Sequence, residues 1–396
     1  MNLARRRFAI LAIFAVPPLL FANTASPQRR TPNKPYLVYV GTYTNKTKSK
    51  GIYAYLFDPG VGKLSPLGVA AESEDPSFLA VHPSGKYLYA VNEIDHFGGQ
   101  KSGAVSSFAI DSKSGKLTLL NQVSTQGAGP CYISLDKTGK FVLVANYDGG
   151  SIAVFPIRED GSLAPASAFV QHSGSSVEKE RQQGPHAHWI GTSPDNRFAL
   201  AADLGLDEIL VYRFNSAKGT LAPDTPPFAK LNPGAGPRHF AFHPNGKFAY
   251  VLTEMGSSVA AFAYKASNGS LSPLQTVSTL SILRKDYSGP KEAAEIAVHP
   301  SGKFLYASNR AGIDTISAFS IDPVKGTLHL KDEYSTMGKT PRNFAIDPTG
   351  KFLLAANQES NKIVIFRIDP TTGALSPTGE VTEAPAPVCI TFVAAK

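Results

Sequence analysis

The chain is poor in cysteine, methionine and tryptophan, with 2, 3 and 1 copies among 396 residues, and several common site signatures are missing. No Cys/His spacing typical of a zinc site accompanies Cys131 and Cys389. The Gly-x-Ser-x-Gly elbow of serine hydrolases, the Walker loop and the dinucleotide-binding fingerprint are also missing. The sequence therefore predicts neither a metal site nor a cofactor.

Helical periodicity is absent after residue 30, and the hydrophobic stretch before it is short. Arg5, Arg6 and Arg7 precede an apolar segment (8–22) and then small residues, the pattern of an export signal peptide. The first residues also fit a twin-arginine signal loosely. We expect a leader and linker over 1–30, one domain over 31–396, and a periplasmic or secreted protein without membrane contact after cleavage. A retained membrane anchor is the alternative.

The chain also lacks a strong charge of either sign once the leader is set aside. Its formal charge is +8, but residues 1–30 hold five arginines and no acid, so residues 31–396 carry only +3. We therefore expect no nucleic-acid partner. Cys131 and Cys389 fall in similar positions of different repeats, too far apart for a disulfide, and should be free buried thiols.

What the sequence does contain is a repeat of about 50 residues, a period typical of propeller blades. A Gly-x-Leu turn follows an alternating apolar run seven times, at Gly62, Gly115, Gly161, Gly219, Gly269, Gly326 and Gly373. A second hairpin, such as IAVHPSGKFLYASNR (296–310), occurs only six times. Its seventh copy is divided between PVCITFV (387–393) and YLVYVGTYT (36–44). Pairing these ends would close a ring without free sheet edges, so we predict an all-β, seven-bladed propeller with a shared closing blade.

The connections predict which face carries the function. The tight turns, including those with His82, His243 and His299, fall on one face and should be structural. The longer links, notably 171–188 and 280–295, fall on the other face, where binding residues usually lie.

Superposing the repeats on the turn proline brings chemically active residues to that second face, at a rim beside the channel. The position six residues before the proline holds His188, Arg238 and Arg342, and the end of the returning strand holds Glu254 and Arg310. His186 would point to the same side as His188 if the segment is extended. Further candidates for contacting substrate are Asp203 and Asn309, although such residues often cap turns. Arg238 and Glu254 could also be only a structural ion pair. His239 should point away and serve packing or support the residues that contact substrate.

The segments GPHAH (184–188), GPRHFAFHPNGKFAY (236–250) and PRNFAIDPTGKFLLAANQ (341–358) resemble the propeller lactonase family. That family includes 6-phosphogluconolactonases and carboxy-muconate lactonizing enzymes, and the resemblance covers residues 36–394. It implies a seven-bladed propeller with the site at the channel mouth. In the muconate branch the implicated His, two Arg and Glu match His188, Arg238, Arg310 and Glu254. The export leader is a departure, because phosphogluconolactone is a substrate of cytoplasmic sugar metabolism.

We therefore expect a monomeric lactonase acting on a small sugar lactone or another acidic lactone. His188 or Glu254 would act as base, and Arg238 and Arg310 would hold the oxyanion or an acidic group of the substrate. His186, Arg342, Asn309 and Asp203 would contact substrate. Two alternatives stay open: a non-enzymatic binding propeller of the cell envelope, and a muconate-type lactonizing isomerase.

Overall fold

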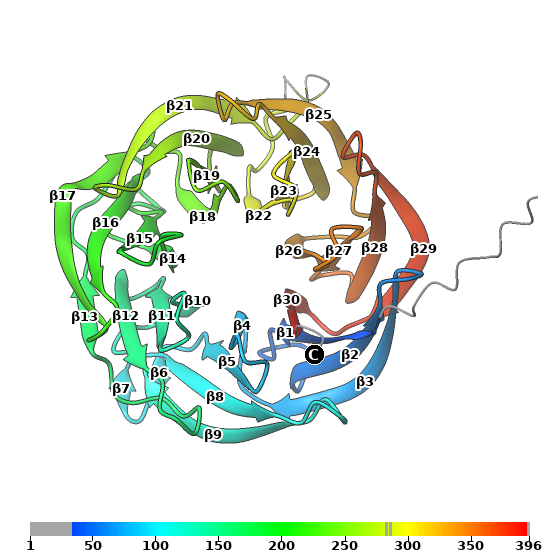
Figure 1. Ribbon diagram of the computed structural model, residues 1–396, viewed down its shortest axis with the longest axis horizontal. Helices are drawn as coiled ribbons and strands as arrows, with labels where there is room; N and C mark the ends of the chain where they lie inside the picture. Colours follow the sequence, from blue (N-terminus) through cyan, green and yellow to red (C-terminus); the bar gives the residue numbers. More distant parts are fainter. Residues whose placement is uncertain (1–33, 282–283, 285–286, 394–396) are drawn as a thin grey trace, which may run out of the picture. The chain divides into compact units, whose positions relative to one another are not determined.

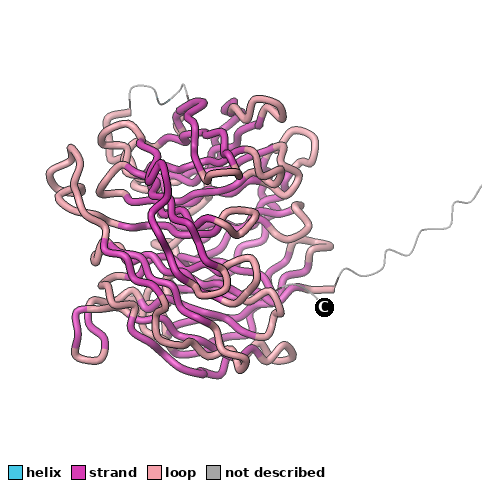
Figure 2. The backbone as a smooth tube through the Cα atoms, turned by 60° about the vertical axis from the view of Figure 1, so that its left-hand side comes forward, coloured by secondary structure: helices cyan, strands magenta, loops and turns pink. Residues whose placement is uncertain are grey.

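The computed structural model describes residues 34–281, 284 and 287–393, and the predicted leader and linker over 1–30 lie outside these residues. Within the described part the chain forms seven four-stranded antiparallel sheets arranged as blades around a central channel (Figure 1). The described chain consists of strands joined by loops and turns, without an α-helix (Figure 2). The prediction of an all-β, seven-bladed propeller is confirmed.

We number the blades along the chain and name the strands of each from the channel outward. Blades 1 and 2 comprise β4 (Leu79–Val81), β5 (Tyr87–Asn92), β8 (Ala104–Ile110) and β9 (Leu117–Ser124), then β10 (Pro130–Leu135), β11 (Phe141–Asn146), β12 (Ser151–Pro156) and β13 (Ala168–Gln171). Blades 3 and 4 comprise β14 (Ala187–Thr192), β15 (Phe198–Asp203), β16 (Glu208–Asn215) and β17 (Thr220–Lys230), then β18 (Pro237–Phe242), β19 (Phe248–Thr253), β20 (Ser258–Lys265) and β21 (Ser270–Ser278). Blades 5 and 6 comprise β22 (Ala293–Val298), β23 (Phe304–Asn309), β24 (Thr315–Ile321) and β25 (Leu328–Ser335), then β26 (Pro341–Ile346), β27 (Phe352–Asn357), β28 (Lys362–Ile368) and β29 (Leu375–Glu383). A small hairpin, β6 (His96–Phe97) with β7 (Gln100–Lys101), lies outside the blades.

Blade 7 joins the two ends of the described chain. Its innermost strand is β30 (Pro387–Val393), which pairs with β1 (Tyr36–Thr42), followed by β2 (Gly51–Asp58) and β3 (Lys63–Glu72). Tyr39 lies opposite Thr391 in this register. The Asn343 side chain also accepts a hydrogen bond of 2.9 Å from the Ile390 amide, which ties blade 6 to blade 7. The predicted closure of the ring is thus present.

The second strands of the blades explain the almost continuous apolar runs of the sequence. Every residue of β11, β15, β19, β23 and β27 is buried, because each blade is packed between two neighbouring blades. In the outermost strands, such as β9 and β29, the residues are largely exposed or alternate between more and less buried positions, since only one face of the strand meets another blade.

The Gly-x-Leu turns need glycine for two physical reasons. Gly219 and Gly326 have φ angles of 68° and 70°, which other residues rarely adopt. A Cβ atom at Gly219 would lie 2.3 Å from the Phe141 ring, and one at Gly326 would lie 2.4 Å from the Phe248 ring. In both cases the ring begins the second strand of the preceding blade, so the turn also packs one blade against the next.

The turn histidines are structural, as predicted. The Nε2 atoms of His82, His243 and His299 lie 2.9, 2.9 and 2.8 Å from glycine carbonyl oxygens in the corresponding turn of the next blade. Cys131 and Cys389 are free and buried, which confirms the prediction of two free buried thiols.

Candidate functional site

β-bulges at the start of the inner strands position the side chains singled out by the repeat comparison. In β14, Ala187 pairs with Asp203 and Trp189 with Ala202, so His188 is an extra residue without an opposite partner. The same irregularity occurs at Cys131 in β10, Arg238 in β18 and Arg342 in β26. The innermost strand of blade 7 has it too, at Val388 in β30. Because a bulge redirects the side chain of the extra residue, this feature sets the direction of His188, Cys131 and Arg342, which line the cavity.

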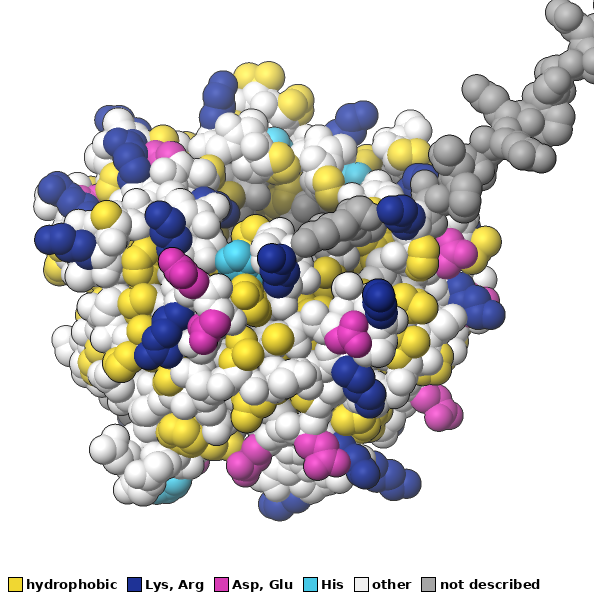
Figure 3. Space-filling model, turned by 60° about the horizontal axis from the view of Figure 1, so that its bottom comes forward, with side chains coloured by type: hydrophobic (Ala, Val, Ile, Leu, Met, Phe, Trp, Pro, Cys, Tyr) yellow, Lys and Arg dark blue, Asp and Glu magenta, His cyan; other side chains and the backbone are white. Residues whose placement is uncertain are grey.

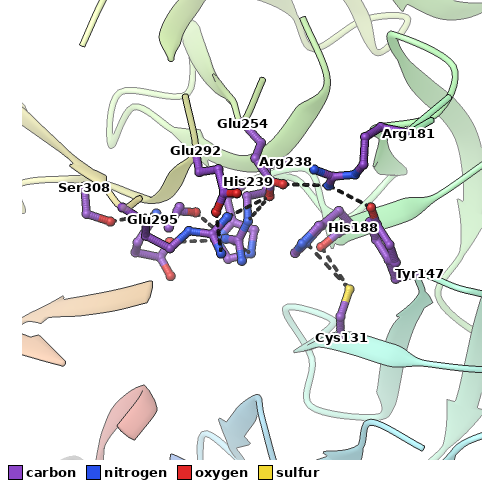
Figure 4. Close-up of polar contacts among 12 residues, drawn as sticks. Cys131, Tyr147, Arg181, His188, Arg238, His239, Glu254, Glu292, Glu295 and Ser308 are labelled. Carbon is purple, nitrogen blue, oxygen red and sulfur yellow. Dashed lines mark hydrogen bonds and ion pairs between the residues drawn. The ribbon is translucent and has the colours of Figure 1, made fainter. Parts of the chain in front are cut away.

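Glu254 lies at the centre of an arginine cluster (Figure 4). Its Oε2 atom accepts from Arg238 Nε at 2.9 Å and forms an ion pair with Arg310 Nη2 at 3.1 Å, and its Oε1 atom accepts from Arg181 Nη2 at 2.7 Å. Burial by itself would raise the pKa of Glu254, but Arg310, Arg238 and Arg181 outweigh it and hold this pKa at about 2. Glu254 is therefore a carboxylate at neutral pH, with its oxygens occupied by arginines.

Further contacts hold Arg238 of this cluster in place. Arg238 Nη1 donates to the Ala294 carbonyl oxygen and lies 3.1 Å from His239 Nε2. His239 Nδ1 lies 3.0 Å from Glu295 Oε1, and Asn343 Nδ2 donates to the other oxygen of Glu295. His239 thus supports Arg238 rather than pointing away from it. Arg238 and Glu254 are only 2% and 5% exposed, so at the predicted rim both side chains are buried rather than open to solvent.

His188 presents a neutral imidazole. Burial lowers its pKa well below 6.5, and the Arg238 charge lowers it further. Its Nδ1 atom lies 3.6 Å from Cys131 Sγ, and its ring stands edge-on to the Tyr147 ring at 5.4 Å. The Nε2 atom makes no hydrogen bond to any residue that the structure describes, and it can accept a proton in the tautomer that carries its hydrogen on Nδ1. Burial raises the pKa of Cys131 well above 9, so this residue is a thiol and a poor nucleophile.

Three of the predicted residues support the site without lining it. His186 stacks on the Tyr147 ring at 4.5 Å, and its Nδ1 lies 3.0 Å from the Tyr147 carbonyl oxygen. Asp203 accepts from the His186 amide and lies 2.6 Å from His172 Nδ1, which fixes both ends of the 171–188 loop. Asn309 Oδ1 accepts from Thr279 Oγ1 at 2.6 Å. These side chains thus bond to other parts of the fold, in keeping with the alternative that Asp203 and Asn309 cap turns.

The site also contains residues that the sequence did not single out. Arg181 comes from the long 171–188 loop and joins Glu254 to the Tyr147 hydroxyl, at 3.0 Å from the latter. The length of this loop predicted that it would carry binding residues, but nothing in the sequence identified which of those residues would reach the channel. Glu93 follows β5 at the repeat position that Glu254 and Arg310 occupy in their own blades. The repeat comparison could therefore have identified Glu93 as a site residue.

These side chains enclose a cavity of about 270 Å³, the size of a small polar molecule. Its lining consists of Glu93, Cys131, Tyr147, Arg181, His188, Glu254, Glu292, Arg310 and Arg342. The described residues contain no group of His, Cys, Asp and Glu that could hold a metal ion. A larger surface hollow of about 860 Å³ lies over blades 6 and 7, lined by residues such as Lys46 and Lys362, and no histidine reaches it.

Arg342 is the one cavity-lining arginine without an ion pair or side-chain hydrogen bond among the described residues. Its guanidinium lies 5.2 Å from the centre of the Tyr43 ring, a cation–π contact. Its hydrogen-bond donors are therefore free to bind an anion, and a guanidinium fork suits a carboxylate or a phosphate.

Comparison with known proteins agrees with this geometry. The family model "Lactonase, 7-bladed beta-propeller" matches residues 37–392. A 6-phosphogluconolactonase of Bacillus subtilis is 38% identical over 358 residues, covering 90% of this chain and 98% of that protein. One of Formosa agariphila is 39% identical over 340 residues, covering 85% and 94%. A periplasmic gluconolactonase of Pseudomonas aeruginosa has a similar solved structure, with a TM-score of 0.84, 37% identity and coverage of 91% and 99%. The chain belongs to the lactonase family of seven-bladed β-propellers, and the prediction of a lactonase-type enzyme is confirmed at this level.

Proposed function

We propose that this protein hydrolyses the ester bond of a small sugar lactone that carries an acidic group, and that the reaction takes place in the cavity between His188 and Arg342. The observation that carries the proposal is the Arg342 guanidinium, without an ion pair among the described residues, in a cavity that also holds the neutral His188 imidazole and Arg310 paired with the Glu254 carboxylate. The names of the similar proteins support a lactone as substrate. On the face shown in Figure 3, basic and acidic side chains are interspersed rather than gathered by sign.

The chemistry follows from the protonation states of the two candidate bases. Glu254 is a poor base, because its pKa is about 2 and both oxygens accept from arginines. His188 is neutral with Nε2 available, so it takes a proton from the water that attacks the lactone carbonyl carbon. The carbonyl oxygen gains negative charge in this step, and Arg310, which lines the cavity and is held by Glu254, stabilises that charge, while Arg238 holds Glu254 in place. The ring C–O bond then breaks, and the leaving oxygen takes up a proton.

The substrate preference can be tested with two sugar lactones that differ by one phosphate group. For 6-phosphogluconolactone, Arg342→Ala should raise KM about 10- to 100-fold, because one charge-assisted contact is lost. For uncharged gluconolactone the same variant should change KM only slightly. Initial rates measured by titration of the released acid provide the values.

Arg197→Ala is the matched control, since Arg197 pairs with Asp195 in a tight turn on the opposite face. Equal losses on both lactones in Arg342→Ala would contradict an anion-binding role. Absence of turnover by the unaltered protein on a panel of neutral, carboxylated and phosphorylated sugar lactones would contradict the proposed function itself.

We further propose that the protein works outside the cytoplasm, after removal of the leader. The sequence of residues 1–30 supports this, as does the similarity to a periplasmic gluconolactonase. Among the described residues there is no helix with the length and hydrophobicity required to cross a membrane.

Protein recovered from the periplasm should have an intact mass that corresponds to a start after Ala22. A mass that includes residues 1–22 would show that the leader is retained.

A further inference from the structure

The residues around the cavity come from two opposite sides of the ring. Blades 3, 4 and 5 provide His188 from β14, Arg238 from β18, Glu254 after β19 and Arg310 after β23, and the inner strands of these blades, β14, β18 and β22, lie together in Figure 1. Across the channel, β26, β30 and β4 lie together and belong to blades 6, 7 and 1. This second side provides Arg342 from β26, Tyr43 from the end of β1 and Glu93 from the end of β5. Glu93 and His188 thus reach the same cavity from different sides.

Glu93 differs from Glu254 in what occupies its oxygens. The Tyr43 hydroxyl donates to Glu93 and lies 2.9 Å from both carboxyl oxygens. No arginine or lysine of the described chain forms an ion pair with Glu93, whereas three arginines contact Glu254. The Glu93 amide donates to the Asp75 carbonyl oxygen at 3.0 Å, which fixes the backbone at the cavity. Glu93 is therefore a positioned carboxyl group with room to exchange a proton with a bound molecule.

The pKa values of Glu93 and Glu254 are also shifted in opposite directions. Burial raises the pKa of Glu93 and is only partly opposed by the Arg342 charge and by the hydroxyls of Ser77 and Tyr43. The other charged or titratable groups around it are Cys131, a thiol, and Asp148, which raises its pKa further. Two carboxyl groups in one site with divergent pKa values are the pattern expected when one stays charged and the other carries a proton.

We propose that Glu93 is the general acid of the lactone reaction, donating its proton to the ring oxygen as the ester C–O bond breaks. This assignment rests on the proposed function. The electron pair of the broken bond goes to the ring oxygen, which takes the Glu93 proton and becomes the product hydroxyl. Glu93 is left as a carboxylate and is reprotonated through solvent by the imidazolium that His188 formed in the first step. Water and lactone are thus converted to the hydroxy acid, and both groups return to their starting states.

Glu93→Gln tests the assignment, with Asp95→Asn as the matched control. Asp95 is exposed on the same loop and undergoes the same change from carboxyl to amide, but does not line the cavity. In Glu93→Gln, kcat on a sugar lactone should fall about 10²-fold or more, the contribution typical of a positioned acid. KM should stay within a few-fold, and the melting temperature should match that of Asp95→Asn. A kcat within a few-fold of the unaltered protein would overturn the assignment.

Tyr43→Phe supplies a readout that a merely structural role of Glu93 would not change. The Tyr43 hydroxyl stabilises the charged carboxylate, so its removal should raise the pKa of Glu93. Activity requires protonated Glu93, and the decline of kcat at high pH should therefore move to higher pH in Tyr43→Phe. In Glu93→Gln that decline should disappear. An unmoved decline in Tyr43→Phe would overturn the assignment even if Glu93→Gln failed to fold.

The outcomes also separate this inference from the proposed function. If the unaltered protein hydrolyses no lactone, both are overturned. If it hydrolyses a lactone while Glu93→Gln has normal kcat, only the assignment of Glu93 fails.

Discussion

A chain that ends at Ala386 is expected to lose the cooperative fold, because the deletion of residues 387–396 removes the innermost strand of blade 7. Val388, Ile390 and Val393 in β30 are 2%, 6% and 7% exposed. Burial of three such side chains contributes roughly 5 to 9 kcal/mol. This is similar to the whole free energy of unfolding of a typical domain, about 5–15 kcal/mol.

The deletion also leaves polar groups without partners in the interior. The β1 edge would lose its ladder to β30, and the Asn343 side chain would lose the Ile390 amide. Unpaired strand edges promote aggregation, so the shortened chain should be found mainly in the insoluble fraction. Soluble yield and the thermal unfolding midpoint measure the effect, with a chain that ends at Val393 as the control for a changed C terminus. A midpoint within a degree or two of that control would contradict the shared closing blade.

Glu254→Gln should reduce both turnover and stability. The neutral amide would leave Arg238 and Arg310 without their shared counter-ion, and loss of one partner of a buried ion pair costs about 3–5 kcal/mol. The same change releases the two guanidiniums from their positions, so kcat should fall about 10²-fold or more. His188→Ala should lower kcat by a comparable factor with much less effect on stability, since His188 forms no ion pair.

The pH dependence of unfolding gives an independent check on Glu254. Its pKa is lowered from 4.5 to about 2 in the folded protein, so its contribution is complete above about pH 4.5 and disappears as pH falls toward 2. A difference of this size corresponds to roughly 3 kcal/mol. The unfolding midpoint of the unaltered protein should decline over this interval more steeply than that of Glu254→Gln. If the Glu254→Gln variant is destabilised but keeps normal turnover per folded molecule, the arginine cluster has only a structural role.

Much of the fold could be predicted because it depends on local patterns that are repeated. Gly219 and its equivalents occur where a turn needs positive φ and close contact with an aromatic ring, and such requirements are visible as a fixed residue at a fixed spacing. The strand pattern at the two ends of the chain likewise indicated the closing blade, since β30 and β1 supply the two halves of one hairpin. The same register predicted that His188, Arg238, Glu254 and Arg310 would converge, and all four contribute to the cavity or its arginine cluster.

The sequence by itself thus determined the ring of blades and the positions that face the channel. Only the tertiary structure shows which of those positions reach the cavity and which groups surround each of them. Whether His186 or His188 enters the cavity depends on the bulge in β14, and the choice between Glu254 and Glu93 as proton carrier depends on which arginines surround each carboxyl group. Arg181 reaches Glu254 only through the path of a long loop. The physical reason is that strand periodicity is a property of neighbouring residues, whereas burial and charge pairing arise between residues of different blades.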